Sequence, residues 1–304
     1  MSDPVVDICV ITYKRPRLLE RLLKSIIHTH LSGPVPFRII VVDNDKERSA
    51  AAIVSSLAKQ YKDLIHYDIE PEKSYSKARN RCLELSEAEN LVFIDDDEWV
   101  DASWLESLIS VQKTYDAALV FGPSVPIMPE KTPTWIIQGR FFEDRDSYNN
   151  GEQVPSGSSA NVLIHKKHIS GTELRFSARF GATGGEDHEL FSRLYHSGNK
   201  MVWADKAVAY EEIIDEKLNF KWIMKRAYRS GDTFAKVHCA HITPGEKIIW
   251  YTKKFIHLIV SAILTPVLYI KGKGYGLRMA SRVVSNYASL YTIFSTSEKN
   301  QTIG

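Results

Sequence analysis

A chain of 304 residues can bury a large core, since a folded domain of about 300 residues hides roughly three quarters of its unfolded surface. Hydrophobic residues make up 44% of the chain and charged residues 25%, values that exclude disordered, collagen-like and disulfide-scaffold classes. The three cysteines form no CxxC pair, so we expect neither a disulfide framework nor a zinc site. The first residues lack a basic stretch followed by an apolar one, and we therefore expect a cytoplasmic protein without a signal peptide.

In chain order, β-rich runs alternate with helical patterns. We expect a first strand at 7–12, followed by leucines and isoleucines at helical spacing up to residue 27. Three further strands are expected at 37–42, 65–69 and 91–94, with helices at 50–61 and 76–85. This alternation is typical of βαβ units. The sequence predicts an α/β fold with a Rossmann-like, mixed but mostly parallel sheet flanked by helices.

The ends of these strands carry polar residues. Thr12 and Tyr13 close the first strand, Asp43 closes the second, and Asp95, Asp96 and Asp97 follow the fourth. In open parallel sheets, ligands bind at the carboxyl ends of the strands. No GxGxxG follows the first strand and no GxxxxGK[ST] occurs, which argues against a dinucleotide-binding dehydrogenase and a P-loop NTPase. Carboxylates can bind a phosphate through Mn²⁺ or Mg²⁺, although an acidic triplet alone also fits a solvated turn or a helix cap.

Net charge is unevenly distributed. Residues 1–216 contain 25 basic and 34 acidic residues, whereas residues 217–304 contain 14 and 3. An acidic body with a basic tail predicts a tail that meets an anionic partner. Because the basic residues are not interleaved through a folded groove, we expect no nucleic acid.

The basic tail includes an uncharged run, 255–270, with lysines on both sides. Its 16 residues are fewer than the roughly 20 that a spanning helix needs. We expect this run to lie in the interface of an anionic membrane, as a peripheral or monotopic anchor; a buried core helix is the alternative. The expected division is therefore a domain at 1–240 and a membrane-associating helical region at 241–304.

An ordered set of motifs runs from about Val5 to Gly231: ITYKRP, VVDND, SKARN, IDDDE and GGEDHEL. This set resembles glycosyltransferase family 2, the inverting nucleotide-sugar transferases of GT-A fold. The resemblance implies a UDP-sugar donor, with UDP-glucose as the commonest case, and Mn²⁺ or Mg²⁺. It also implies an acceptor such as a polyprenyl-diphosphate-linked oligosaccharide, used at the cytoplasmic face of the membrane for exopolysaccharide, capsule or O-antigen.

The resemblance assigns donor-binding roles to residues near the first three motifs. Thr12 and Tyr13 fall where the family binds the base, and a flat aromatic ring can stack on uracil. Asp43 would accept a hydrogen bond from the base, unless it only forms an Asx-turn with its neighbour. Arg79 and Asn80 begin a helix against the nucleotide, and Arg79 could instead be a surface cation.

The two acidic motifs carry the remaining assignments. Asp97, with Asp95, would hold the metal, and Asp96 or Asp95 would contact the ribose. An inverting transfer needs a base for the acceptor hydroxyl, and the resemblance assigns that role to Asp187, with Glu186 beside it. A Glu-Asp pair is also ordinary at the start of a helix.

Features around these motifs complete the prediction. Gly184 and Gly185 would let the backbone approach a sugar closely. The stretch 135–163 has the composition of a ligand-covering loop, which we expect to return to a strand at 158–161. Glu211 stands where many family members have a histidine, which leaves a third protein ligand for the metal open.

Two alternatives compete with the transferase. A sugar nucleotidyltransferase would open with a Gly-rich loop after the first strand, which this chain lacks. A non-catalytic, membrane-docked scaffold would not need the intact Asp97 and Asp187.

Overall fold

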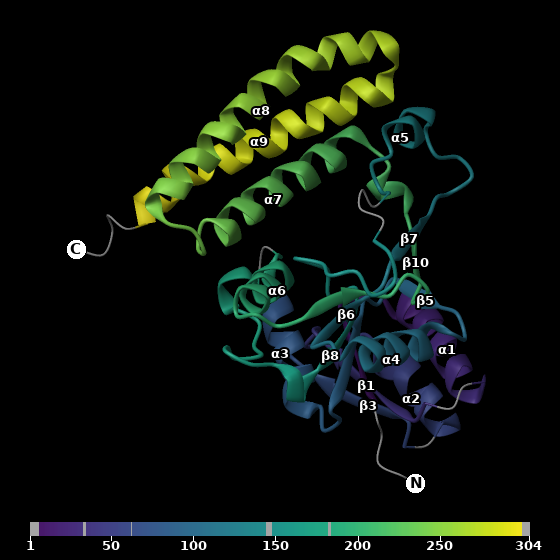
Figure 1. Ribbon diagram of the computed structural model, residues 1–304. Helices are drawn as coiled ribbons and strands as arrows, with labels where there is room; N and C mark the ends of the chain where they lie inside the picture. Colours follow the sequence, from purple (N-terminus) through teal and green to yellow (C-terminus); the bar gives the residue numbers. More distant parts are fainter. Residues whose placement is uncertain (1–5, 33–34, 62, 144–147, 182–183, 300–304) are drawn as a thin grey trace. The chain divides into compact units, whose positions relative to one another are not determined.

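The chain folds into two compact units. The computed structural model describes residues 6–32, 35–61, 63–143, 148–181 and 184–299 (Figure 1). The first unit comprises Met1–Val125 and Arg145–Glu211, and the second comprises Pro126–Asp144 and Glu212–Gly304. These units are defined by compactness. The expected division at residue 240 concerns membrane association and stays a prediction.

The first unit is built on a seven-stranded sheet. Its strands are β1 (Val6–Thr12), β2 (Phe37–Asp43), β3 (Ile65–Ile69), β4 (Asn90–Ile94), β6 (Leu119–Phe121), β8 (Asn161–His165) and β9 (Met201–Trp203). Their order is β3-β2-β1-β4-β8-β6-β9. Strands β1 to β4 pair in parallel, as do β6 and β9, while β8 is antiparallel to both neighbours. The expected mixed, mostly parallel sheet is confirmed.

Helices cover both faces of this sheet (Figure 1). Alternate residues of a strand point to opposite faces. Ile8 and Val10 of β1 pack with α1 (Pro16–Ser32), α2 (Ala51–Gln60) and α4 (Trp104–Tyr115). Cys9, between them, packs with α3 (Tyr75–Leu85) and α6 (Glu186–His196). The sheet is buried on both sides, which explains its continuous apolar strands.

Shorter elements connect and flank this core. A second sheet has the order β5-β10-β7, in which β5 and β10 are antiparallel. These elements are β5 (Glu98–Val100), β7 (Ser124–Ile127), β10 (Ala209–Glu212) and the 3₁₀ turns η1 (Lys166–His168), η2 (Ala178–Phe180) and η3 (Asp215–Lys217).

The second unit is helical. It contains α5 (Thr134–Gly139), α7 (Phe220–His238), α8 (Pro244–Lys271) and α9 (Lys273–Lys299), and α9 packs against the other three. Helices α7 and α9 approach closely at Gly231, where an added Cβ would lie 2.1 Å from the Ser285 carbonyl oxygen. The Ser289 hydroxyl donates to the Gly231 carbonyl at 2.9 Å.

The expectation of a ligand-covering loop is wrong for the first part of 135–163, which contains α5 and belongs to the second unit. The expected return to a strand is confirmed by β8, which begins at Asn161. In the first part, Ile136 is buried with Ile213 and Ile223, and Trp135 and Phe142 pack on the same cluster. Aromatic residues in this stretch therefore build a small hydrophobic core.

Helix α8 is continuous over 28 residues. It starts with a capping box, in which the Thr243 hydroxyl accepts from the Glu246 N–H and the Glu246 carboxylate accepts from the Thr243 N–H. Its outward face exposes a row of apolar side chains: Ile248, Ile249, Phe255, Ile256, Ile259, Val260, Ile263, Leu264, Val267 and Ile270. The buried core helix is therefore wrong for this segment. Within the described residues, α8 is long and apolar enough to cross a membrane. The shortness of the apolar run therefore does not exclude a spanning helix, and the interfacial placement stays a prediction.

Candidate active site

The carboxyl ends of neighbouring strands bring the first two motifs together. Strands β2, β1 and β4 are adjacent, and Thr12 pairs in register with Asp43. The Thr12 hydroxyl donates to Asp96 Oδ2 at 2.7 Å, which ties the end of β1 to the turn after β4. The expected meeting of strand-end residues is thus found for Thr12 and the acidic triplet.

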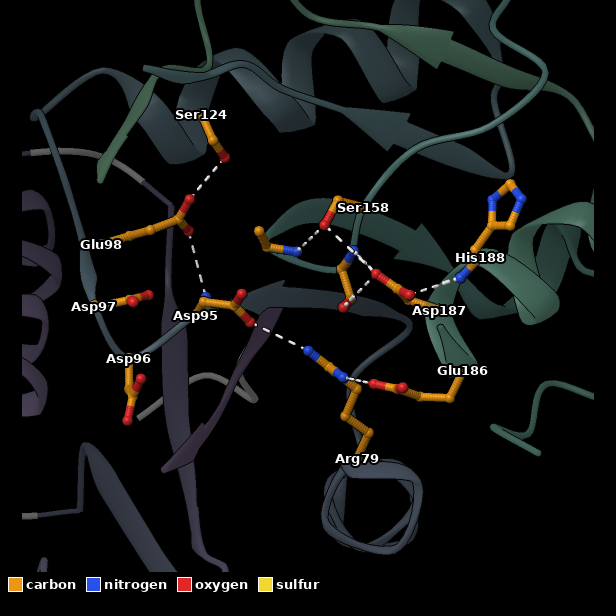
Figure 2. Close-up of polar contacts among 12 residues, drawn as sticks. Arg79, Asp95, Asp96, Asp97, Glu98, Ser124, Ser158, Glu186, Asp187 and His188 are labelled. Atoms are coloured by element: carbon orange, nitrogen blue, oxygen red, sulfur yellow. Dashed lines mark hydrogen bonds and ion pairs between the residues drawn. The ribbon is translucent and has the colours of Figure 1, made fainter. Parts of the chain in front are cut away.

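The acidic triplet forms a tight turn that Glu98 closes. The Glu98 N–H donates to the Asp95 carbonyl at 3.2 Å. In return, Glu98 Oε2 accepts from the Asp95 N–H at 3.3 Å, and Glu98 Oε1 accepts from the Ser124 hydroxyl at 2.6 Å (Figure 2). Glu98, for which no role was predicted, has a buried side chain that positions the turn.

Two arginines hold this turn, one through carboxylates and one through the backbone. Arg15 Nη1 donates to Asp96 Oδ1 at 3.1 Å and to Asp97 Oδ2 at 3.2 Å. Arg21 Nη2 donates to the Asp97 carbonyl at 3.0 Å, and its guanidinium lies over the Trp99 ring. Neither arginine was predicted as a site residue, because the helical spacing of the segment after the first strand is informative only about its apolar residues.

Arg79 joins the two acidic motifs. Its Nη2 donates to Asp95 Oδ1 at 3.2 Å, and its Nη1 pairs with Glu186 Oε1 (Figure 2). The Arg79 side chain is only 7% exposed, so the surface-cation alternative is wrong. The other oxygen of Glu186, Oε2, is buried without a hydrogen-bond partner. Arg79 therefore links the turn after β4 to the start of α6.

Asp187 is held from the loop before β8. Its Oδ2 accepts from the Ser159 N–H and hydroxyl, both at 3.3 Å, and from the Ser158 hydroxyl at 3.5 Å. Its Oδ1 accepts from the His188 N–H at 2.7 Å (Figure 2). These donors fix the direction of the carboxylate, as a proton acceptor in catalysis requires.

Gly184 and Gly185 lie in a backbone conformation that favours glycine. Their φ angles are +80° and +98°, in the left-handed region. A Cβ on Gly184 would meet no protein atom within 4 Å, and the close approach of a sugar stays a prediction. Both glycines turn the chain into α6 and thereby aim Glu186 and Asp187.

Three other assigned residues lie in settings that the sequence did not reveal. Asp43 is fully buried, and its carboxylate accepts from the N–H groups of Asp45 and Ala50 and from the Tyr67 hydroxyl. Asp43 therefore does not expose its carboxylate at the strand end, and its bond from the Asp45 N–H forms the Asx-turn given above as the alternative.

Asn80 also turns inward. Its side-chain amide donates to the Phe176 carbonyl at 2.9 Å and accepts from the Phe176 N–H at 2.8 Å. A direct nucleotide contact through that amide is therefore wrong, and Asn80 positions the Phe176 segment. The Tyr13 ring is half-buried and flanked by Lys73 Nζ, 4.2 Å from its centroid, and Lys14 Nζ, at 5.4 Å.

The clustered acids are costly to ionise. Burial raises the pKa of Asp95 to about 7; Asp97 and Asp96 add to the rise, and Arg79 opposes it. Burial likewise raises the pKa of Glu186 against the effect of Arg79, and raises that of Glu98 well above its usual value. A cation bound here would relieve this repulsion.

The acidic turn fits a divalent ion that arrives with a phosphate. Among the described residues, no group of three or more His, Cys, Asp or Glu side chains is arranged to hold a metal ion by itself. Mg²⁺ and similar ions commonly bind one or two protein carboxylates and complete their shell with substrate phosphates and water. Asp95 and Asp97 supply such oxygen ligands. Glu211 pairs in register with Glu98 in the second sheet, and its role as a ligand stays open.

Comparisons with known proteins agree with this geometry. Residues 7–171 match the family model described as Glycosyl transferase family 2. The succinoglycan biosynthesis protein ExoM of Rhizobium meliloti (strain 1021) is 33% identical over 232 residues, which are 76% of this chain and 74% of ExoM.

Two solved structures share the fold. The mannosyltransferase PcManGT of Pyrobaculum calidifontis, in complex with GDP-Man and Mn²⁺, aligns with a TM-score of 0.65 at 15% identity, over 96% of this chain and 88% of that one. S. aureus TarS 1-349 in complex with UDP-GlcNAc aligns with a TM-score of 0.54 at 15% identity, over 96% of this chain and 92% of that one. The expected GT-A fold is confirmed.

Proposed function

The chain belongs to glycosyl transferase family 2, and on that premise we propose that it moves a sugar from a UDP-sugar to a polyprenyl-diphosphate-linked oligosaccharide, with inversion. The observation that carries the proposal is the Arg79 bridge, because it joins Asp95 of the donor motif to Glu186 of the base motif. The name of ExoM supports exopolysaccharide as the product class, and the TarS complex supports a UDP-sugar. UDP-glucose is the first donor to test.

The donor end of the site is formed by β1, β2 and the acidic turn. The half-buried Tyr13 ring would stack on the base. Asp43 would contribute indirectly, because its bond from the Asp45 N–H shapes the turn at the end of β2. Asp96 would contact the ribose from the position that Thr12 and Arg15 give it. Such contacts hold the donor in one orientation.

The metal, Mn²⁺ or Mg²⁺, would be held by Asp97 and Asp95. When bound, a divalent ion supplies charge neutralisation for the diphosphate as it leaves. Arg79 keeps Asp95 directed toward the site and offsets part of the repulsion among the carboxylates. The protein thus prepares a negatively charged turn in a fixed shape.

Asp187 is the proposed base. The acceptor hydroxyl would attack the anomeric carbon from the face opposite the nucleotide and give its proton to Asp187, while the bond from that carbon to the diphosphate oxygen breaks and UDP leaves. Ser158, Ser159 and the His188 N–H hold the carboxylate for that transfer. Glu186 would position Asp187 through its pair with Arg79.

The second unit would meet the membrane that carries the acceptor. The apolar face of α8 is exposed, and Lys253 and Lys254 precede it while Lys271 follows it. Apolar area bordered by lysines favours an anionic lipid surface. We propose peripheral attachment at the cytoplasmic face of the plasma membrane, where a lipid-linked acceptor is found.

A nucleotide-release assay tests the transferase proposal. The full chain is incubated with UDP-, GDP- and dTDP-sugars in Mn²⁺, Mg²⁺ or EDTA, beside Asp97→Asn. We expect slow, metal-dependent release of UDP from one sugar donor, lost in Asp97→Asn. Release from a GDP- or dTDP-sugar instead, or equal release in EDTA, would contradict the proposed donor or the proposed metal.

Vesicle flotation tests the membrane proposal. We expect the full chain to float with vesicles containing anionic lipid, and Ile259→Glu with Ile263→Glu to remain in solution, because both side chains lie on the exposed face. Ala262→Glu replaces an exposed small residue within the same run and serves as a control for added charge. Equal flotation of the paired variant and the full chain would contradict the proposal.

A further inference from the structure

Arg15 contacts the acidic turn from the loop between β1 and α1. The preceding residue, Lys14, has a φ of +56°, and its N–H donates to the Ser49 hydroxyl at 3.2 Å. A non-glycine residue in the left-handed region is uncommon and is retained where the surrounding structure holds it. The bend directs Arg15 Nη1 between Asp96 and Asp97.

The two arginines on the carboxylates differ in how firmly they are held. The Arg79 side chain is 7% exposed, whereas that of Arg15 is 47% exposed. Ion pairs with a solvent-exposed partner are weak and exchange at little cost, while a buried arginine cannot leave its carboxylates without stranding their charge. The side chains of Asp96 and Asp97 are 7% and 15% exposed, so Arg15 can leave them where another cation, such as a divalent ion, takes its place.

A guanidinium beside Asp97 opposes a divalent cation at the same carboxylate. It is also well suited to a diphosphate, since its planar fork matches phosphate oxygens. Lys14 and Lys73, both within 5.4 Å of the Tyr13 ring centroid, add positive charge at this end of β1. The loop thus offers cations to a polyanionic ligand bound beside the acidic turn.

We propose that Arg15 is an exchangeable counter-ion, which competes with the divalent cation for Asp97 in the free protein and contacts the donor diphosphate once the nucleotide binds. This inference rests on the proposed function. It gives Arg15 two effects of opposite sign. Arg15 weakens the binding of the metal alone, and it strengthens the binding of the nucleotide with its metal.

The test measures Mn²⁺ binding without nucleotide, by the electron paramagnetic resonance of free Mn²⁺, and UDP binding at saturating Mn²⁺, by calorimetry. In Arg15→Gln we expect Mn²⁺ alone to bind about 1.5-fold to fivefold more tightly, the range for loss of one exposed counter-ion. We expect UDP to bind about tenfold or more weakly, since a charge-assisted phosphate contact is lost.

Two further variants separate this role from a structural one. Arg15→Lys keeps the charge without the fork, so it should hold Mn²⁺ affinity near that of the unaltered chain and weaken UDP binding. Arg17→Gln removes the same charge from an exposed position in the first turn of α1, and it should change neither. Thermal melting of each variant checks folding.

The outcomes are distinct. Tighter Mn²⁺ binding together with weaker UDP binding in Arg15→Gln supports the inference. If the unaltered chain binds both ligands and Arg15→Gln weakens both or changes neither, the inference is overturned while the proposed function stands. If the unaltered chain binds neither Mn²⁺ nor UDP, the proposed function fails and this inference fails with it.

Discussion

Replacing Arg79 with glutamine removes the cation shared by two carboxylates of the site. The side chains of Arg79 and Glu186 are 7% and 3% exposed, and Arg79 also reaches Asp95. Removing one partner of a buried ion pair leaves an uncompensated charge and costs about 3–5 kcal/mol. Glutamine keeps one donor, so we expect Arg79→Gln to lower the free energy of unfolding by about 3 kcal/mol.

A double-mutant cycle measured by urea unfolding tests this reasoning. Glu186→Gln in the Arg79→Gln background removes the stranded charge, and the double variant should recover at least about 1 kcal/mol relative to additive losses. Arg81→Gln is the control, because Arg81 lies on the same helix, is 38% exposed and pairs with Asp68 and Glu84. Arg81→Gln should lower the free energy of unfolding by less than about 1 kcal/mol. Strictly additive losses, or equal losses for Arg79→Gln and Arg81→Gln, would refute the bridge.

Three further predictions concern stability. Burial raises the pKa of Asp7, but Arg38 and the Ala88 N–H lower it by more, so the folded-state pKa lies below the ordinary value of 3.8. The stabilising contribution of the Asp7 carboxylate is therefore present above pH 3.8 and is lost as pH falls through the folded-state pKa. Asp7→Asn should lower the free energy of unfolding, measured by urea unfolding, by about 3 kcal/mol at pH 7 and by less at pH 3. Since the pKa of Asp95 is raised to about 7, thermal stability should fall as pH rises from about 4 to about 7, and Asp95→Asn should flatten that slope; a slope unchanged in Asp95→Asn would argue against it. Gly231→Ala puts a Cβ 2.1 Å from the Ser285 carbonyl oxygen and should cost about 1–3 kcal/mol, seen as faster proteolysis of the α7–α9 region; an unchanged cleavage rate would contradict the close packing.

Sequence patterns were sufficient for the four parallel strands β1 to β4 of the sheet and for the gathering of their ends. Alternation of apolar strands and helices predicts parallel pairing, and parallel pairing puts Thr12 and the acidic turn at one edge. The pairing of Arg79 with Glu186, across more than 100 residues, is fixed by tertiary packing alone. The sequence could name both residues but not the bond between them.

The misassigned residues share a physical reason. Asn80 and Asp43 are polar residues next to a site, and a sequence pattern does not tell whether such a side chain faces the ligand or the backbone behind it. Asn80 takes both partners from Phe176, and Asp43 satisfies the turn before α2. Arg15 was overlooked because a cation in a loop has no periodicity, and its direction depends on the backbone at Lys14.

The second unit was only partly predictable. The apolar run of α8 was visible in the sequence, but its continuity over 28 residues depends on a cap at Thr243 and on helical residues on both sides of the run. Residues 126–144 belong to the second unit because Ile136, Phe142 and Trp222 pack together, and no local sequence pattern predicts that packing.

The most direct test of the account is a parallel measurement of turnover and UDP affinity in Asp187→Asn. Asparagine keeps the size of the side chain and part of its hydrogen bonding to Ser158 and Ser159, but it cannot accept the proton. Loss of a general base predicts a fall in kcat of about 10²- to 10⁴-fold with UDP affinity within about twofold of the unaltered chain. Turnover within a few-fold of the unaltered chain, or loss of UDP binding together with activity, would contradict Asp187 as the base.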